Sequence, residues 1–243
     1  MKIRQHSLFI SIAIVLTAMI LSYAFINRSQ KSNIISVTGL GSRDFVSDLI
    51  VWRGKFTRKN DDLKLAYAEL DADRAVIQKY LSEKGFTEKD IVFSSIKIQK
   101  LESPIFDQNG EQQGSVFAGY QLEQEVVIES KQVDKVEGIS REVSRLINQG
   151  VEFYSEEPQY YYTKLAELKI EMIAEATKDA NIRATRIAEN ADSDVGTLKN
   201  AEMGVFQIVG QNSAEDYSWG GSFNTESKRK TASITVKLDY EVD

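Results

Sequence analysis

Cysteine is absent from this chain of 243 residues, and histidine occurs once, at His6. Without cysteine the fold has no disulfide bonds and no lipoprotein anchor, so a sizeable hydrophobic core must hold it together. The remainder of the chain after His6 lacks both the usual base near neutral pH and the commonest metal ligand. We therefore expect no catalytic residues, no cofactor and no metal site, and an activity that is insensitive to thiol reagents.

Basic residues are outnumbered, because 30 Lys and Arg face 36 Asp and Glu and give a formal net charge of −6. Two of the basic residues, Lys2 and Arg4, precede a long apolar run, so the rest of the chain is more acidic still. The only dense basic patch, Lys228 to Lys230, flanks an expected strand and is interpreted as a solvated edge. This balance argues against binding of nucleic acid and against a polybasic contact with anionic lipid.

An uncharged run extends from Leu8 to Ile26. As a helix it would span about 28 Å, close to the hydrocarbon thickness of a bilayer. The run predicts a single-pass inner-membrane anchor with the C-terminal domain in the periplasm. The alternative is a signal peptide cleaved after Ala24, where Ser22 and Ala24 supply small residues, and a soluble periplasmic product. We expect an anchor or signal at residues 1–26, a linker at 27–33 and an α+β domain at 34–243.

Hydrophobic periodicity in residues 34–243 predicts an alternation of strands and helices. The expected strands cover residues 34–39, 45–56, 91–101, 116–128, 151–154, 195–209 and 232–242. The expected helices begin after Asp62, at Val133 and at Tyr160, and end near Gly85, Gly150 and Ala191. This order predicts antiparallel hairpins with helices packed on one face, as one larger domain or two small ones sharing a core.

Polar residues at 104–114 include Asp107, Asn109 and Gly110, which are typical of tight turns. A calcium loop would need oxygen ligands at alternate positions and a distal glutamate, and these are missing. We interpret the segment as the loop of a hairpin. The short motif Gly39-Leu40-Gly41 lacks the third glycine of a dinucleotide fingerprint and is interpreted as a turn that ends a strand.

The last predicted helix has a face of small side chains, which allow another backbone to approach closely. Either a sheet of the same chain or a second copy could pack there. The candidate interface residues on this face are Ala176, Ala180, Ala184 and Ile187.

Aromatic residues form the other candidate site, where they would contact a ligand or a partner. The alternative is that they pack in the core or at an interface. The candidate ligand or partner contacts are Tyr154, Tyr160, Tyr161, Tyr162, Tyr217 and Trp219. A hydrolase that uses two carboxylates could employ the adjacent acids Glu156 and Glu157. Because they precede Pro158, we interpret them instead as part of a solvated turn.

Several short motifs occur in an order that resembles the SIMPL-domain family of bacterial cell-envelope proteins, which includes periplasmic immunogenic and oxidative-stress defence proteins. The matching residues are ISVTGLG at 35–41, Asp48, KGF at 84–86, Gly119 with Tyr120, EVVI at 125–128, RATRIA at 183–188, Val195 with Gly196, and ITVKLDY at 234–240. The resemblance covers about residues 33 to 243. It implies an envelope protein without catalytic residues to carry over, ring-like self-assembly and a link to stress defence.

Two functions follow as expectations. The first is a non-enzymatic cell-envelope protein that self-assembles, as a homo-oligomer, or binds a protein partner. The alternative is a periplasmic module that binds a small ligand through the aromatic residues.

Overall fold

The computed structural model describes residues 13–23, 34–215 and 218–242, and the domain they form consists of two compact units. The first unit contains residues 34–41, 173–204 and 234–242. The second contains Ser42–Met172 and Val205–Ser233. Helices accompany mainly antiparallel sheets, which confirms the expected mixed α+β class.

The second unit is built on a six-stranded antiparallel sheet with two long central strands, β2 (Leu49–Asn60) and β5 (Gln112–Ser130). These two pair continuously from Ile50 opposite Ser130 to Asn60 opposite Tyr120. The remaining strands pair with the outer sides of this central pair. They are β3 (Ile91–Phe93) and β4 (Lys97–Phe106), which pair with β5, and β6 (Phe153–Ser155) and β7 (Gln159–Tyr161), which pair with β2.

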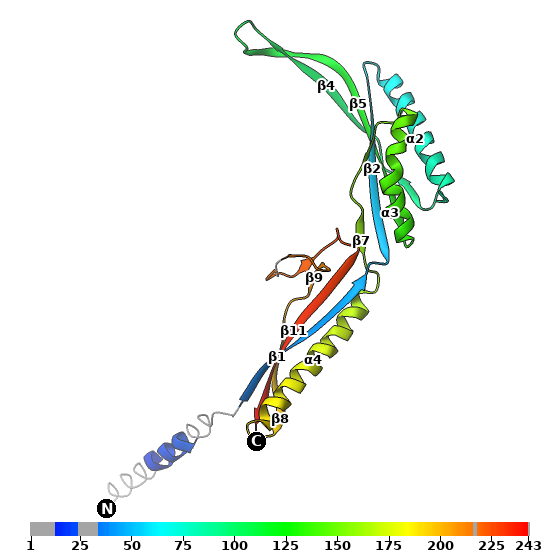
Figure 1. Ribbon diagram of the computed structural model, residues 1–243. Helices are drawn as coiled ribbons and strands as arrows, with labels where there is room; N and C mark the ends of the chain where they lie inside the picture. The colour runs from blue at the N-terminus through cyan, green and yellow to red at the C-terminus, as the bar shows by residue number, and fades with distance from the viewer. Residues whose placement is uncertain (1–12, 24–33, 216–217, 243) are drawn as a thin grey trace, which may run out of the picture. The chain divides into compact units, whose positions relative to one another are not determined.

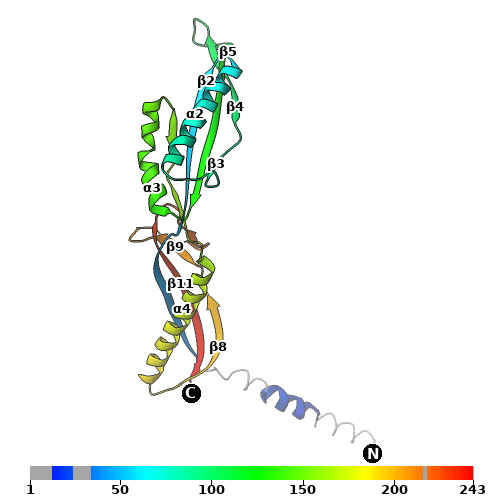
Figure 2. The same ribbon diagram turned by 90° about the vertical axis from the view of Figure 1, so that its right-hand side faces the viewer.

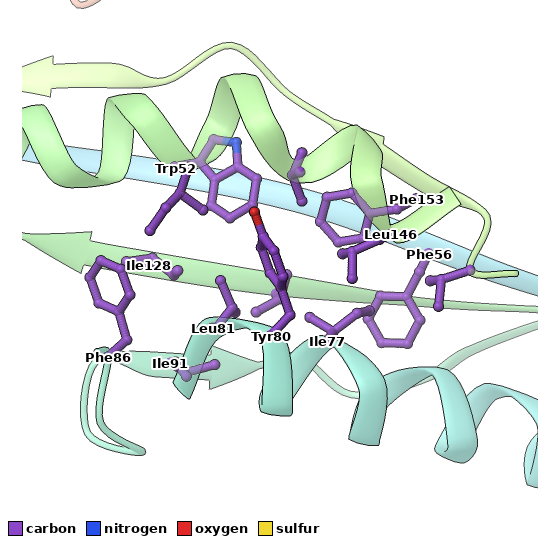
Figure 3. Close-up of a cluster of buried hydrophobic side chains, with 14 of the residues drawn as sticks. Trp52, Phe56, Ile77, Tyr80, Leu81, Phe86, Ile91, Ile128, Leu146 and Phe153 are labelled. Carbon is purple, nitrogen blue, oxygen red and sulfur yellow. The ribbon is translucent and has the colours of Figure 1, made fainter. Parts of the chain in front are cut away.

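One face of this sheet is covered by helices α2 (Leu63–Glu83) and α3 (Val133–Glu142), the latter continued by the 3-10 helix η1 (Val143–Gln149) (Figures 1 and 2). As predicted, Asp62 caps α2, because its carboxylate accepts hydrogen bonds from the N–H groups of Lys64 and Leu65. Apolar side chains of both helices and both central strands fill the space between them (Figure 3). The labelled core residues include Trp52, Phe56, Ile77, Leu81, Ile128 and Leu146.

The second unit also contains β9 (Gln207–Gly210), β10 (Ser222–Phe223) and the first residues of β11 (Arg229–Val242). Strand β9 pairs antiparallel with the start of β11, whereas β10 pairs parallel with β9. These strands belong to a five-stranded sheet that also includes β1 (Ile34–Val46) and β8 (Val195–Met203).

In the first unit, the residues of α4 (Leu165–Glu189) from 173 onward pack along β1 and β11 (Figures 1 and 2). The approach is close enough that a β-carbon added at Gly39 would lie 2.1 Å from the carbonyl oxygen of Ala176. Asp179 strengthens the contact, because its carboxylate accepts a 2.8 Å hydrogen bond from the N–H of Leu40. Glycine on the strand and alanine on the helix are therefore complementary features of one packing contact.

Of the predicted anchor from Leu8 to Ile26, residues 13–23 are described, and they are helical. The rest of the run lies outside the described residues. No helix within the described part of the chain is long and apolar enough to cross a membrane.

Several predicted element boundaries are wrong. The motif Gly39-Leu40-Gly41 does not end a strand, because β1 continues through it to Val46. The segment 104–114 is a loop only at its centre, since residues 104–106 and 112–114 are in strands. The predicted strand 91–101 is two strands, β3 and β4. The helix expected from Tyr160 begins at Leu165, because Gln159–Tyr161 pair with β2 instead. The predicted strand 195–209 is also interrupted, between β8 and β9.

Candidate functional site

Strand β4 pairs antiparallel with residues 112–123 of β5, and from Glu102 to Phe106 the two strands continue beyond the rest of the sheet as a two-stranded hairpin. We call β4 together with residues 112–118 of β5 the ribbon. Strand β2 pairs with β5 only from Tyr120 onward, so within the described residues each strand of the ribbon has one free edge. In Figure 1 the ribbon extends past the end of α2 that lies nearest to it. Free edges present unpaired backbone donors and acceptors, which makes the ribbon a ready surface for another strand.

The turn at the tip of the ribbon explains why residues 104–114 form a hairpin. Gly110 has φ +82°, a conformation that favours glycine. Asp107 accepts hydrogen bonds from the N–H groups of Asn109 and Glu111, at 2.8 and 2.9 Å, and the bond from Glu111 is the main cause that lowers the pKa of Asp107. The interpretation of these residues as a hairpin turn is therefore confirmed.

Several large apolar side chains are exposed along the ribbon. Ile98 is 58% exposed and Phe106 is 59% exposed. The exposed large apolar residues of the ribbon are Ile98, Ile105, Phe106, Val116 and Phe117. Clustered apolar side chains on two unpaired edges are typical of a protein–protein contact rather than of a solvated loop.

Polar residues at the middle of β4 are held by weak contacts within the ribbon. The ammonium group of Lys100 lies 5.5 Å from the ring centroid of Phe117, and the hydroxyl of Ser115 donates a 2.7 Å hydrogen bond to Glu102. Gly119 lies where β5 leaves the ribbon and begins to pair with β2. Its φ is +103°, and a β-carbon there would lie 3.0 Å from the carbonyl oxygen of Asn60, so the position favours glycine.

The predicted alanine face has an intramolecular partner. Ala176, Ala180 and Ala184 are fully buried, whereas Ile187 is half exposed. Ala176 and Ala180 meet the backbone of β1 at Gly39, which accounts for their small size without a second copy. The role of this face as an interface between copies stays a prediction that these contacts do not test.

The predicted aromatic residues are spread over separate environments. Tyr160 is only 7% exposed, lies opposite Ile50 and belongs to the core, and burial raises its pKa. Tyr154 is exposed on β6, where its hydroxyl donates to Glu152, and Tyr161 and Tyr162 are half-buried. Trp219 is fully exposed, and Tyr217 lies outside the described residues.

One member of the acidic pair before Pro158 is engaged by a lysine of β2. Glu156 forms a 2.5 Å ion pair with Lys55, and the hydrogen bond within this pair raises the pKa of the lysine. Within the described residues, no group of three or more His, Asp or Glu side chains is placed to hold a metal ion.

A buried lysine was missed by the sequence interpretation, which treated Lys228 to Lys230 as a solvated edge. Lys230 is 2% exposed, and its ammonium group donates to the Ser47 hydroxyl at 3.1 Å and to the carbonyl oxygen of Tyr160. Burial lowers the pKa of Lys230 from its usual 10.5 to about 8. The alternation of side chains along β11 could have indicated this, because Lys230 shares a face with the buried Ala232.

This lysine fastens the start of β11 to β7 and to the connection between β1 and β2. Ser47 is 3% exposed, so its hydroxyl is not open to a substrate. Beside it lies a surface depression of about 570 Å³, lined by residues 46–48 and 131–135 and by Lys228. Lys228 is occupied by ion pairs with Asp134 and Glu137 from α3. The cluster therefore holds elements together.

The model of the SIMPL family, described as "Protein of unknown function (DUF541)", matches residues 35–240. No curated protein matches the chain. Because the family model spans nearly the whole domain, the chain belongs to the SIMPL family.

Proposed function

We propose that this protein is a non-catalytic cell-envelope protein that assembles with copies of itself, or binds another protein, through the ribbon. The observation that carries the proposal is the ribbon itself, with two free edges and exposed apolar side chains such as Phe106 and Phe117. By contrast, the sheet of the second unit is covered by α2 and α3, and the alanine face of α4 is buried against β1.

Energetics support a binding role. A two-stranded hairpin without a covered face is only marginally stable in water. Full burial of one large apolar side chain contributes about 1.5–3 kcal/mol. The five exposed apolar side chains of the ribbon are already about half buried, so a contact that covers them gains roughly half of that amount for each, against the entropy lost on association.

The proposed location is the inner membrane, with the run from Leu8 to Ile26 as the anchor and the domain in the periplasm. The alternative is a soluble periplasmic protein produced by cleavage after Ala24. Intact mass measurement of the protein purified from cells distinguishes the two, because cleavage removes the first 24 residues.

The test of assembly is native mass spectrometry of the full-length chain in a mild detergent. The variant Phe106→Ser/Val116→Ser/Phe117→Ser removes apolar contact area from the ribbon. The matched control is Leu65→Ser/Tyr67→Ser, which removes side chains of similar exposure from α2. Fluorescence of the buried Trp52 reports whether each variant remains folded.

We expect the wild-type chain and the α2 control to form the same oligomer, or capture the same partner, and the folded ribbon variant to lose it. A wild-type chain that stays monomeric and captures nothing would overturn the proposal, as would a ribbon variant that assembles normally. The resemblance links assembly to stress defence, so cells that depend on the protein should survive oxidants less well with the ribbon variant.

A further inference from the structure

We propose that two copies of the chain pair through the free edge of β4, antiparallel, with Leu101 of one copy opposite Leu101 of the other. This inference rests on the proposed function, since it names the partner and the register of the ribbon contact. It follows from the free edge of β4, from the exposed side chains beside Leu101 and from the order of their charges.

Two-fold symmetry restricts how two β4 strands can be aligned with each other. A two-fold contact is isologous, so an antiparallel pair of identical strands has one central residue that faces its own copy. Centring on Lys100 places lysine opposite lysine, and centring on Glu102 places glutamate opposite glutamate. Centring on Leu101 places Lys100 opposite Glu102 twice. Opposite charges across strands stabilise the pair and like charges destabilise it, so the register on Leu101 is favoured.

The local structure of β4 permits this register. Lys100 pairs with Tyr120 but Glu102 pairs with Phe117, so two residues of β5 lie opposite Leu101. The one extra residue of this bulge is on β5, and β4 itself runs evenly. Lys100 and Glu102 are exposed on the same face of the strand, and Leu101 is on the other face, half-buried. Pro104 lies opposite Ile98 in this register, so it limits the pairing to the residues between them.

The first test uses the absence of cysteine, since one introduced cysteine is then unique. Directly opposite residues of antiparallel strands have Cα atoms about 4.5–5.5 Å apart, which suits a disulfide. Full-length Leu101→Cys should therefore form a disulfide-linked dimer on mild oxidation. The matched control is Ser103→Cys, on the same face two residues along, where the two copies' Cα atoms would be about 13 Å apart and unable to bridge.

The second test reverses charges. Lys100→Glu and Glu102→Lys each place like charges opposite each other twice, and each should weaken dimerisation about tenfold or more, measured by sedimentation. The double variant Lys100→Glu/Glu102→Lys restores both opposite pairs and should return within about threefold of wild type. Glu102→Lys makes each copy less negative, so weakening by this variant indicates facing lysines and not repulsion between whole molecules.

Each outcome separates the inference from the proposed function. Crosslinking at Ser103 rather than Leu101, or no recovery in the double variant, overturns the register. Absence of both crosslinks, together with an oligomer that the Phe106→Ser/Val116→Ser/Phe117→Ser variant abolishes, overturns this pairing and leaves ribbon assembly standing. An oligomer that none of these variants changes overturns both.

Discussion

Lys228 and Lys230 lie two residues apart and have opposite electrostatic environments. Lys228 donates hydrogen bonds to Asp134 and Glu137, and these bonds raise the pKa of its ammonium group. Lys230 has no carboxylate among its hydrogen-bond partners, and burial lowers its pKa to about 8. The two lysines should therefore give the stability of the second unit opposite dependences on pH.

For Lys230 the unfolded chain, with a pKa near 10.5, binds more protons than the folded chain between pH 8 and 10.5, so its contribution to stability rises with pH across that window. Lys230→Met should remove this rise, which amounts to about 3 kcal/mol if the whole shift is realised. The measurement is the free energy of unfolding in urea at pH 7.5, 9 and 10, followed by Trp52 fluorescence.

Lys228→Met is the control. Its raised pKa gives a contribution that is present below the unfolded pKa and is lost as the pH rises through the folded pKa. This variant should destabilise the protein at pH 7.5 and lessen the loss at high pH. Parallel pH profiles for the wild type and Lys230→Met would contradict the assignment of the low pKa to Lys230.

Two glycines should respond oppositely to replacement by alanine. At Gly39 a β-carbon would lie 2.1 Å from the backbone of α4, so Gly39→Ala should destabilise the first unit by about 2 kcal/mol or more. At Gly138, within α3, a β-carbon has open space, so Gly138→Ala should stabilise by about 0.5–1 kcal/mol. Thermal unfolding followed by circular dichroism measures both, and equal effects would contradict the close approach at Gly39.

At the scale of elements, an ion pair between the half-buried Arg58 and the buried Asp73 joins β2 to α2. Arg58 makes two hydrogen bonds to the carboxylate of Asp73, at 2.5 and 2.7 Å, and a third to the carbonyl oxygen of Gly150. Arg58→Met leaves the buried Asp73 without its partner and should cost about 3 kcal/mol of unfolding free energy. The additional change Asp73→Leu should recover most of this loss, because it removes the uncompensated charge.

Arg186→Met provides the comparison, because the Arg186–Glu189 pair on α4 is largely exposed. Its loss should change stability by less than about 0.5 kcal/mol. The free energy of unfolding in urea is measured for the three variants. Equal losses of stability in Arg58→Met and Arg186→Met would show that burial of Asp73 does not decide the strength of the ion pair.

Elements with local signals were predictable from the sequence. Helix α2 begins after its cap at Asp62 and is followed by Gly85 in the left-handed conformation, both as expected. The start of α4 was not predictable in this way. Tyr160 fits the helical spacing, but its backbone pairs with β2 and its ring enters the core, and a partner distant in sequence decides this.

The same reason limits prediction of the candidate site. The turn at Asp107 and Gly110 could be predicted because its hydrogen bonds are local. The exposure of Ile105 and Phe106 could not, since a strand that lies on a core and one that extends past it have similar residues. Lys230 illustrates the reverse case, in which a charged residue is interpreted as solvated until its neighbours in the β1–β2 connection and in β7 are known.

For the whole molecule, net charge should govern how assembly responds to salt. Each copy carries a formal charge of −6, so copies repel over distances that salt screens to about 10 Å at 0.1 M. The two Lys100–Glu102 pairs between copies lie well within this distance, so salt weakens them less than it weakens the repulsion between whole molecules. We therefore expect association to strengthen severalfold between 20 and 200 mM NaCl, measured by sedimentation.

The variant Lys100→Glu/Glu102→Lys has the same net charge and should show the same dependence on salt. Association that weakens as salt is added would mean that the ion pairs between copies outweigh the repulsion between whole molecules.

The two edges of the ribbon have a consequence for the number of copies in an assembly. Pairing through β4 leaves residues 112–118 of β5 on both outer edges, an uncharged segment without proline to block another strand. These outer edges are identical, so they too can meet only like with like. Copies would then join alternately through the β4 edge and the β5 edge, so a closed ring would contain an even number of copies. A trimer or a pentamer would need a contact that the ribbon does not provide.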